Sequence, residues 1–376
     1  MTSINSLKTI HIHTDYKFVH NTHRFEGPKF TNHVIIFKKD KPYKGPYEHS
    51  AKLYGKEEID DVIRFCKDAD LVILYNLEIL KSKIVLALPG HVNIAWRFFG
   101  TEFYSRMEKT VLSEKSLKAV TGLKKTTKDF LRPFYHRIKY GNSLDKVFFK
   151  AIDRIDYMLI LNKKEYEFLS THFGKLPEYI RFPIRKERIN GGSTNVGLKK
   201  KNKIVLGNSK QAFNNHLDIL EEIEKTESRI SYNFRLLFNY GPENNYTKAV
   251  RKFVKGKSYY SMIEEFIPAE EFKDFYDDIN ALVINGYRQM AMGNIFLALS
   301  NGVKVYLNKK NVMMHWLLSE GIEVFPIENL SIDLENDNIK LDEKTACNNL
   351  ENLKKIYTNS TEEDLQKTIY LEIDRE

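Results

Sequence analysis

Residues 277–285 read DDINALVIN, a polar helix end followed by a short run of buried-strand residues. The same phrase recurs as DADLVILY at residues 68–75 and as RIDYMLIL at residues 154–161. Short apolar runs that alternate with helical patterns are typical of parallel sheets whose two faces are both covered by helices. The sequence therefore predicts an α/β fold along its whole length.

Strand and helix patterns alternate on both sides of a polar, glycine-bearing segment. We predict further strands near residues 8–13, 33–38, 92–98, 179–182, 203–207, 234–239, 260–266, 303–306 and 323–326. We predict helices near residues 56–67, 102–119, 125–139, 143–154, 164–173, 213–227, 245–255, 269–277, 293–301 and 312–320. Two Rossmann-like, doubly wound domains facing across a cleft account for this alternation. Their predicted bounds are residues 1–190 and 203–345, with a linker at 191–202 and a helical tail at 346–376.

The composition describes a globular protein that favours anionic partners. With 376 residues, of which 42% are hydrophobic and 12% aromatic, the chain is long enough for two cores. Fifty-nine Lys and Arg against fifty Asp and Glu give a net charge of +9. Such a charge favours nucleic acid, nucleotides, phospholipid headgroups or lipid-linked phosphates, and does not choose among them.

Cysteine usage and the N-terminus indicate the compartment. Neither Cys66 nor Cys347 lies in a C-x-x-C or Cys/His cluster, which excludes a disulfide framework or a structural zinc site and fits a reducing cytoplasm. Residues 1–13 show no basic region followed by an apolar one, so we expect no secretion signal. The longest apolar stretch, residues 84–99, is interrupted and shorter than the roughly 20 residues of a membrane-spanning helix. We therefore expect a cytoplasmic protein that at most lies on a membrane surface.

The sharpest local feature is the turn LGNSK at residues 206–210, directly after the first strand of the second domain. A glycine lets the backbone turn tightly, and small polar residues before a helix present N–H groups and a hydroxyl to phosphate. Gly207, Asn208 and Ser209 are therefore candidates for a pyrophosphate site. The alternative is a plain strand-to-helix turn in which Asn214 or Asn215 is the N-cap.

Two more turns follow strands of the second domain. Residues 239–245 read NYGPENN, which suits either a ligand-facing loop or a Gly-Pro turn before a helix. Residues 285–296 form a loop that carries Arg288 and enters a helix at Gly293 and Asn294. An arginine beside a helix N-terminus can clamp a diphosphate, and the alternative is an ordinary loop with a solvated arginine.

The first half carries the candidate acids and bases. Glu102 lies at a helix start after the predicted strand near 92–98, and it suits a general base if a cleft raises its pKa. The alternative is a carboxylate that complements the helix dipole. The other titratable residues surround the first strand end and suit the same cleft, or are packed or solvated: His11, His13, Asp15, His20 and His23.

Residues 124–150 mix basic residues with apolar and aromatic ones. An interfacial helix has this composition, because one face meets acyl chains while Lys and Arg meet anionic headgroups. The alternative is a helix pair whose aromatic residues face the core. The residues concerned are Phe130, Leu131, Phe134, Tyr135, Ile138, Tyr140, Phe148 and Phe149. We predict contact with an anionic membrane surface, and no nucleic-acid-binding module is recognisable.

Five motifs, in order along the chain, resemble one bacterial family. WRFFGTEFY at residues 96–104 resembles its W-x-x-W-G-[AS]-D-L-Y, and FPIR at 182–185 resembles its F-P-T-R. LGNS at 206–209, with Asn215-His216, resembles the family's V-G-N-S followed by N-x-H. YGPENNY at 240–246 resembles its glycine-tyrosine-proline-asparagine turn, and NGVKVYLN at 301–308 resembles its A-G-I-P-C-V-L-N. The family comprises the TDP-N-acetylfucosamine:lipid II N-acetylfucosaminyltransferases, which transfer 4-acetamido-4,6-dideoxygalactose in envelope polysaccharide synthesis.

The resemblance implies a GT-B glycosyltransferase that works without an essential metal or other cofactor. The enzyme would move a deoxyamino sugar from a dTDP-sugar to a polyprenyl-diphosphate-linked saccharide at the inner face of the cytoplasmic membrane. The polysaccharide would be O-antigen, capsule or common antigen. No metal ligands and no nucleic-acid partner are expected.

The residue patterns and the resemblance together give candidate roles to residues of this chain. Glu102 is the candidate base, with Asp15 second, while His13, Arg97 and Arg185 would line the acceptor side or the cleft. The expected donor-binding residues are Gly207, Asn208, Ser209, His216, Tyr240, Asn245, Arg288, Gly293 and Asn294.

The chain departs from the family near the expected sugar sites. Glu102 stands where the family has aspartate, Phe99 where it has tryptophan, and the loop before residue 293 has fewer glycines. These differences leave alternatives open: a related transferase that uses GDP-fucose or a UDP-sugar, or a catalytically idle homologue that binds saccharide.

Overall fold

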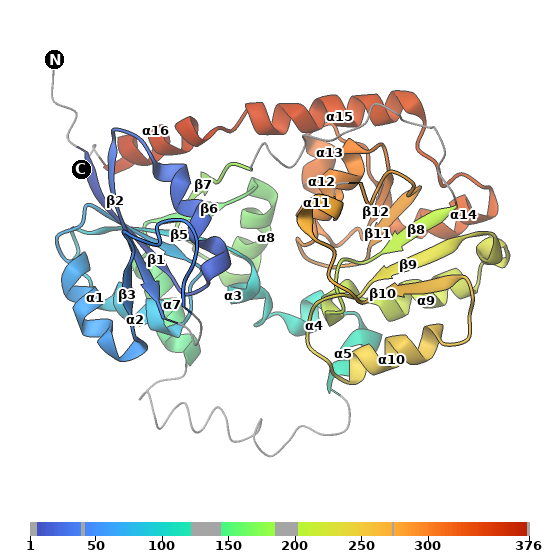
Figure 1. The fold of residues 1–376 in the computed structure, drawn as a ribbon, viewed down its shortest axis with the longest axis horizontal. Helices are drawn as coiled ribbons and strands as arrows, with labels where there is room; N and C mark the ends of the chain where they lie inside the picture. The colour runs from blue at the N-terminus through green and yellow to red at the C-terminus, as the bar shows by residue number, and fades with distance from the viewer. Residues whose placement is uncertain (1–5, 39–41, 122–143, 185–201, 273, 374–376) are drawn as a thin grey trace. The chain divides into compact units, whose positions relative to one another are not determined.

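The computed structural model describes residues 6–38, 42–121, 144–184, 202–272 and 274–373. Contacts between residues divide the chain into two units. The first unit comprises residues 1–103, 126–184 and 360–376, and the second comprises residues 104–125 and 185–359. Each unit is built around one parallel sheet (Figure 1).

The sheet of the first unit has the strand order β3-β2-β1-β4-β5-β6-β7, and all neighbours pair in parallel. Its strands are β1 (Leu7–His13), β2 (Phe30–Phe37), β3 (Lys52–Tyr54), β4 (Leu71–Tyr75), β5 (Asn93–Arg97), β6 (Tyr157–Ile160) and β7 (Glu178–Arg181). Its helices are α1 (Ile59–Cys66), α2 (Ile79–Ala87), α7 (Leu144–Arg154), α8 (Lys163–Phe173) and α16 (Glu362–Ile373), with 3-10 helices η1 (Tyr16–Phe25) and η2 (Lys56–Glu58).

The sheet of the second unit has the order β10-β9-β8-β11-β12-β13, again parallel throughout. Its strands are β8 (Lys203–Leu206), β9 (Asn233–Leu237), β10 (Tyr260–Ile263), β11 (Ala281–Ile284), β12 (Lys304–Leu307) and β13 (Phe325–Pro326). Its helices are α4 (Glu108–Val111), α5 (Glu114–Thr121), α9 (His216–Glu224), α10 (Asn245–Val254), α11 (Ala269–Phe272), α12 (Met292–Ser300), α13 (Val312–Ser319), α14 (Leu330–Glu335) and α15 (Glu343–Thr358). Short 3-10 helices are η4 (Ala212–Asn214), η5 (Glu227–Ser231) and η6 (Ile327–Asn329).

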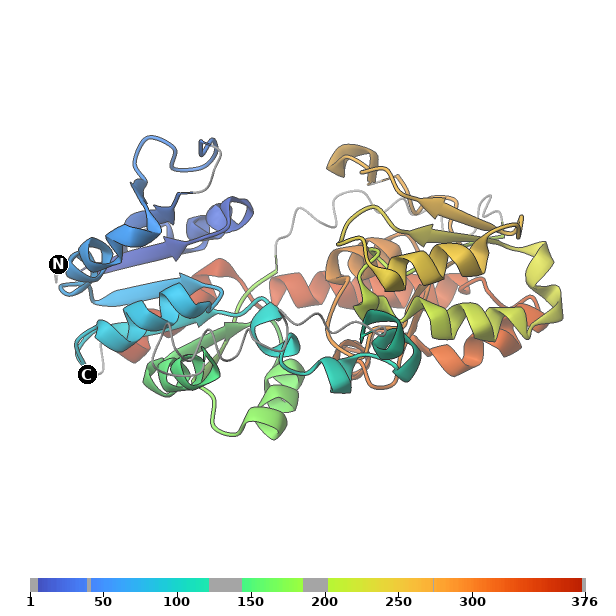
Figure 2. The same ribbon diagram turned by 90° about the horizontal axis from the view of Figure 1, so that it is seen from below.

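Helices cover both faces of the second sheet, which explains why its central strands are apolar on both sides. Every residue of β11 and of β12 is buried. Figure 1 shows α12, α13 and α15 on one face and α9 and α10 on the other, and Figure 2 looks onto the face with α9, α10 and α5. In both units the strand order reverses at the first strand, between β1 and β4 and between β8 and β11.

Two segments join a unit that the predicted bounds did not give them. Residues 104–125 belong by contact to the second unit, and residues 360–376 belong to the first. The last helix, α16, buries Leu365 and Ile369 in the core of the first unit, and Gln366 Nε2 donates to the carbonyl oxygens of Arg24 and Glu26 at 2.9 and 3.0 Å. The end of the chain is thus anchored to the first sheet.

The helix predicted over residues 102–119 is wrong, because the structure has three short helices there. α3 (Thr101–Tyr104), α4 and α5 are separated by residues with extended or irregular backbone. Leu112 has a ψ of 143°, and the Ser113 hydroxyl accepts the backbone N–H of Ser116 at 3.1 Å, which starts a new helix. The prediction also missed β3, α2 and α14.

The predicted membrane contact falls partly on residues 122–143, which lie outside the described residues. Within α7, Phe148 is 2% exposed and packs its ring against Trp96 and Phe103, so it belongs to the core and does not face a membrane. Among the described residues, no helix is both long enough and apolar enough to cross a bilayer. Contact of the remaining residues with a membrane surface stays a prediction.

A buried ion pair joins the second sheet to α14. Lys304 at the start of β12 is 3% exposed, and its Nζ lies 2.8 Å from Asp333 Oδ2 and 2.7 Å from the carbonyl oxygen of Asn338. The Tyr306 hydroxyl donates to the same carboxylate oxygen at 2.5 Å. Removing one partner of a buried pair leaves the other charge desolvated and uncompensated.

We therefore expect Asp333→Ala to lower the unfolding free energy by about 3–5 kcal/mol, measured by urea unfolding at pH 7. Glu328→Ala is the matched control, because its carboxylate lies 3.7 Å from Lys309 Nζ with both side chains more than half exposed. The control should lose less than about 1 kcal/mol. Equal losses in the two variants would contradict the assignment.

Candidate nucleotide-binding site

The second sheet places three polar turns at one edge. The turn after β8, the turn after β9 and the loop after β11 all follow carboxyl ends of parallel strands. In open parallel sheets, ligands bind at this edge where the strand order reverses. The reversal here lies between β8 and β11, so the turn at Gly207 and the loop at Gly286 flank it.

Gly207 has a left-handed backbone, with a φ of +69°, and its N–H donates to the carbonyl oxygen of Val283 at 2.9 Å. A Cβ atom at this position would lie 2.3 Å from Nε2 of His216. Both the backbone conformation and the neighbouring imidazole therefore require glycine. The phosphate-binding turn predicted from LGNSK thus has the geometry of a tight turn, with a histidine packed into the space that glycine leaves.

His216 is held in one orientation by Tyr246. Its backbone N–H donates to the Tyr246 hydroxyl at 2.8 Å, and its Nδ1 lies 2.9 Å from the same oxygen. A hydroxyl that donates to Nδ1 leaves the ring proton on Nε2. That atom is buried and has no hydrogen-bond partner among the described residues. Burial lowers the pKa of His216 to about 3, so the ring beside the turn is neutral at pH 7.

The residues after Gly207 are held by a second buried side chain. Asn214 accepts the backbone N–H of Asn208 at 3.0 Å, and its Nδ2 donates to Ser209 Oγ at 3.1 Å. Asn208 Nδ2 donates to the hydroxyl of Tyr240 at 2.9 Å, which joins the turn after β8 to the turn after β9. Tyr240 is 48% exposed, so its ring face is open to solvent.

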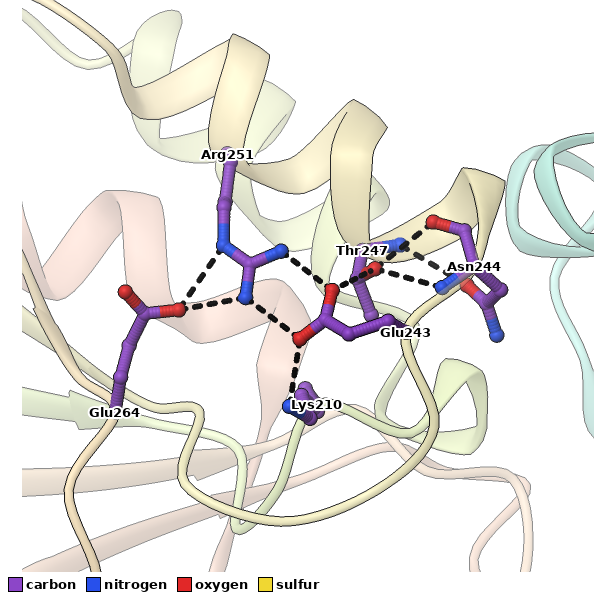
Figure 3. Close-up of polar contacts among 6 residues, drawn as sticks. All are labelled: Lys210, Glu243, Asn244, Thr247, Arg251 and Glu264. Carbon is purple, nitrogen blue, oxygen red and sulfur yellow. Dashed lines mark hydrogen bonds and ion pairs between the residues drawn. The ribbon is translucent and has the colours of Figure 1, made fainter.

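An ion-pair network fixes the turn after β9 (Figure 3). Glu243 accepts from Lys210 Nζ at 2.6 Å and from both terminal nitrogens of Arg251 at 2.7 and 2.8 Å. The hydrogen bonds from Arg251 and then Lys210 hold the pKa of Glu243 well below its usual range. Arg251 also donates to Glu264 at 2.6 and 2.9 Å. Glu243 therefore neutralises the charge of the Lys210 ammonium, and this ion pair helps to fix the turn after β9.

Asn245, predicted as a ligand-binding residue, is the exposed first residue of α10. The residue that caps this helix is Asn244, whose Oδ1 accepts the backbone N–H of Thr247 at 3.1 Å, while the Thr247 hydroxyl accepts the N–H of Asn244 at 3.0 Å. This reciprocal pair is visible in Figure 3. Asn245 is thus placed at the same sheet edge, one residue beyond the cap.

Two buried asparagines join the turn after β8 to the loop after β11. Asn215 Nδ2 donates to the carbonyl oxygen of Asn285, and Asn285 Nδ2 donates to that of Asn215, both at 3.0 Å. Asn308 Nδ2, after β12, donates to Asn285 Oδ1 at 2.8 Å. Asn215 has a left-handed φ of 48° and is fully buried. We did not predict Asn285 and Asn308 as site residues, although each asparagine directly follows a buried strand.

The loop after β11 holds Arg288 between two aromatic rings. The guanidinium carbon lies 5.0 Å from the ring centre of Tyr104 and 4.7 Å from that of Phe213. Gly293 and Asn294 lie in the first turn of α12, as predicted. A helix N-terminus and an arginine are thus carried by one loop, next to the turn of Gly207 along the sheet.

A cavity of about 360 Å³ lies on the α9 side of the same unit. Its lining includes three carboxylates, those of Asp218, Glu222 and Glu328, against one ammonium, that of Lys115. Burial raises the pKa of Asp218, as expected for a carboxyl without full charge compensation. Because this lining is acidic, the cavity does not suit a diphosphate, and the turn of Gly207 remains the candidate anion site.

In the first unit, the predicted residues His11 and His13 of β1 are buried, Asp15 and His20 are half-buried, and His23 is exposed. His13 is fully buried, stacks on Tyr75 at 4.0 Å, and has its Nε2 2.9 Å from the Thr22 hydroxyl. Burial and then the nearby His11 and Lys81 hold the pKa of His13 well below its usual value. Asp15 is the N-cap of η1 and accepts the backbone N–H of Lys17 at 3.2 Å.

Glu102 is 7% exposed, and its Oε1 accepts from the backbone N–H groups of Leu77 and Phe99 at 3.3 Å and from the Trp96 indole at 3.4 Å. Burial raises its pKa, and these donors oppose the rise. The carboxylate therefore joins the ends of β4 and β5, an anchoring role that the sequence did not reveal. Its role as a base stays a prediction.

Arg97, at the end of β5, donates to the carbonyl oxygens of Phe98 and Leu159 at 2.7 and 3.0 Å and lies 4.1 Å from the ring centre of Phe182. Burial lowers its pKa to about 10, so it stays charged at neutral pH. Arg185 lies outside the described residues. Across the parts of the chain that the structure describes, no group of three or more His, Cys, Asp or Glu side chains is placed to hold a metal ion.

Together, the two parallel sheets and their reversed strand orders place the chain in the GT-B class of folds, with two Rossmann-like domains. The predicted α/β fold class is confirmed. The chain is similar to the lipopolysaccharide outer core galactosyltransferase WaaB in its apo form, with a TM-score of 0.63, 11% identity, and coverage of 97% of this chain and 100% of that one.

Similarity extends to the α-glucosyltransferase AGT in complex with UDP, with a TM-score of 0.54, 10% identity, and coverage of 98% and 100%. The N-terminal domain of the Candida albicans trehalose-6-phosphate phosphatase matches with a TM-score of 0.63, 11% identity, and coverage of 98% and 96%. No protein-family model and no curated protein matches the sequence. At these identities the likeness shows the fold, and the reaction has to be argued from the site.

We expect Gly207→Ala to abolish anion binding at the turn and to destabilise the protein by more than Gly256→Ala. Gly256 has the same left-handed conformation, with a φ of +80°, but a Cβ there meets nothing within 4 Å. The control therefore reports only the backbone cost, about 1–2 kcal/mol. Urea unfolding measures both variants, and equal losses would mean that His216 moves freely away from the turn.

We also expect Glu102→Gln to change the pH dependence of stability. A glutamate has an ordinary pKa of 4.5, and burial raises that of Glu102 in the folded protein. Its contribution to stability is thus present below pH 4.5 and is lost as the pH rises through the folded-state pKa. Glutamine keeps an acceptor oxygen but does not ionise.

The difference in unfolding free energy, variant minus wild type, should therefore rise as the pH increases from 4.5 to 7.5. Urea unfolding at several pH values measures it. Glu178→Gln, at an exposed residue of β7, is the control and should give a flat difference. A flat difference for Glu102→Gln as well would show that the donors fully offset the burial of the carboxylate.

Proposed function

We propose that this protein is a glycosyltransferase that takes a sugar from a nucleoside-diphosphate donor. The observation that carries the proposal is the buried, neutral His216 donor beside the left-handed turn at Gly207, at the strand-order reversal of the second sheet. A neutral N–H donor in a tight turn suits phosphate oxygens, because it donates without a proton that titrates near neutral pH.

The elements beside the turn supply the rest of a diphosphate site. The N-terminus of α12 and the Arg288 guanidinium carry partial or full positive charge, whereas the backbone N–H groups of Gly207 and Asn208 already donate within the protein. Negative charge builds up on the diphosphate as the bond to the sugar breaks. Preorganised donors that stabilise the leaving diphosphate lower the barrier electrostatically, and this is the role we assign to the turn and to Arg288.

The first unit would supply the acceptor side of the reaction. A raised pKa suits a general base, and Glu102 has one through burial. Asp15, at the end of β1, is the second candidate, with His13, Arg97 and Arg185 near the acceptor. The anchoring contacts of Glu102 argue that the carboxylate also holds the ends of β4 and β5 in place.

The family resemblance supports a finer proposal for the substrates. We assign the donor as a dTDP-linked deoxyamino sugar of the 4-acetamido-4,6-dideoxygalactose type and the acceptor as a polyprenyl-diphosphate-linked saccharide of a bacterial surface polysaccharide. The basic segment at 124–150 would then meet the anionic inner face of the cytoplasmic membrane. No metal or other cofactor is part of this proposal.

Other donors and roles have their own support. AGT is solved with UDP, which favours a test of UDP-sugars beside GDP-fucose. A further AGT structure contains UDP and a 13-mer DNA, so a nucleic-acid acceptor is compatible with the fold. The Candida albicans phosphatase domain shows that the fold also serves other proteins. A catalytically idle saccharide-binding homologue is therefore the alternative from a different class.

Thermal unfolding with dTDP, UDP, GDP and ADP tests the donor site, because a ligand that binds the native state raises the melting temperature. We expect the largest rise with dTDP. His216→Phe keeps a buried ring but removes the N–H donor, and it should lose most of the rise. His315→Ala, at an exposed histidine of α13, is the control and should keep it.

The outcomes of this experiment distinguish the donor nucleotides from one another and a transferase from an idle homologue. A rise with UDP or GDP alone would keep a transferase and overturn the dTDP donor. No rise with any nucleotide would overturn the donor site and favour the idle homologue. A full rise in His216→Phe would remove His216 from the site. Release of dTDP from a dTDP-sugar in the presence of a polyprenyl-diphosphate saccharide then measures transfer directly.

A further inference from the structure

Residues 104–121, here named the crossing segment, lie between strands of the first sheet in sequence but belong to the second unit by contact. β5 ends at Arg97 and β6 begins at Tyr157, and the chain passes to the second unit directly after Phe103. A parallel crossover needs only a helix to return to its own sheet. The topology of the first sheet therefore does not explain why the chain passes to the second unit here.

The start of the crossing segment contacts Arg288. Tyr104 is 1% exposed, and its ring centre lies 5.0 Å from the guanidinium carbon, while the Phe213 ring lies 4.7 Å from the same atom. Arg288 Nη1 donates to the carbonyl oxygen of Gln289 at 3.0 Å. A cation between two aromatic faces is attracted to both, so the rings restrict where the guanidinium can lie.

The middle of the crossing segment contacts the asparagine pair at the strand-order reversal. The backbone N–H of Ser113 donates to Asn215 Oδ1 at 2.9 Å, and the Ser113 hydroxyl donates to Asp218 in the first turn of α9. Asn215 uses its other amide atom to bind the carbonyl oxygen of Asn285. The segment is therefore hydrogen-bonded to the residue between Asn214 and His216, as well as stacked on Arg288.

We infer that the crossing segment completes the donor site, with Tyr104 as the positioning residue that holds Arg288 toward the bound diphosphate. The inference rests on the proposed function, because it concerns the same anion. The inference adds that residues of the crossing segment, which precede β6 in the sequence, determine the affinity of the second unit for the nucleoside diphosphate. Ser113 has the companion role of holding Asn215, and through it the turn of Gly207.

A double-mutant cycle between Tyr104 and Arg288 tests the inference, with the dissociation constant of the nucleoside diphosphate that stabilises the wild-type protein measured by calorimetry. Tyr104→Leu should weaken binding about fivefold, as expected for losing one aromatic face of a cation–π contact. Tyr104→Phe keeps that face and should restore wild-type affinity. In an Arg288→Ala background, Tyr104→Leu should change the affinity less than twofold.

The cycle separates positioning from general packing. If Tyr104 only stabilised the fold, Tyr104→Leu would weaken binding equally in both backgrounds, and the inference would be overturned. Unchanged affinity in Tyr104→Leu alone would overturn it as well. Phe213→Leu provides a second route to the same contact and should also lose its effect without Arg288. Binding of no nucleotide by the wild-type protein would overturn the proposed function itself, and this inference with it.

Discussion

The turn after β8 depends on one close approach, that of the His216 imidazole to the backbone of Gly207. Because residue 207 lacks a Cβ, β8 can turn with a φ of +69° while Nε2 of His216 occupies the space beside it. The same histidine binds Tyr246 twice, which ties the start of α9 to α10. Asn215, one residue earlier, then reaches Asn285 across the strand-order reversal. A side chain at 207 would therefore disturb two helices and two strands together.

The sequence was sufficient for most strands and for the fold class, because buried parallel strands read as apolar runs wherever helices cover both faces. It failed where tertiary contacts override local pattern. α2 buries Lys81 and Ser82 but exposes Lys83, so its polar residues lie on more than one side and no amphipathic face is visible in the sequence. Lys81 Nζ donates to the Thr14 hydroxyl and to oxygens of Tyr75 and Asn76. These three residues lie outside α2, so the periodicity of the helix does not reveal the pairing. The broken helix at 102–119 likewise reflects packing of α5 against α9 and α10 of the second unit.

The candidate site was predictable to the level of its turns and no further. A glycine after a strand marks a turn in any sequence, so Gly207 could be found without a structure. Other properties of the site depend on burial and on partners far away in sequence. His216 is neutral because it is buried, and it contacts Tyr246, while Glu102 joins two strand ends through partners such as Leu77. Arg288 was found as a charge in a loop, but its aromatic neighbours come from two distant segments. Those pairings are fixed only when the whole unit folds.

Charge at this sheet edge is scarcer than the net charge of +9 suggests. Lys210, the lysine nearest the turn in sequence, is bound to Glu243, which also takes both terminal nitrogens of Arg251. Two cations are thus used to build the turn after β9. Arg288 carries a full positive charge on the loop that leads to α12, and Lys310, after β12, has its Nζ 4.4 Å from the ring centre of Tyr287 in the same loop. In the proposed site, restricting one guanidinium between Tyr104 and Phe213 would control the affinity for the anion through geometry, whereas a basic cluster would control it through charge alone.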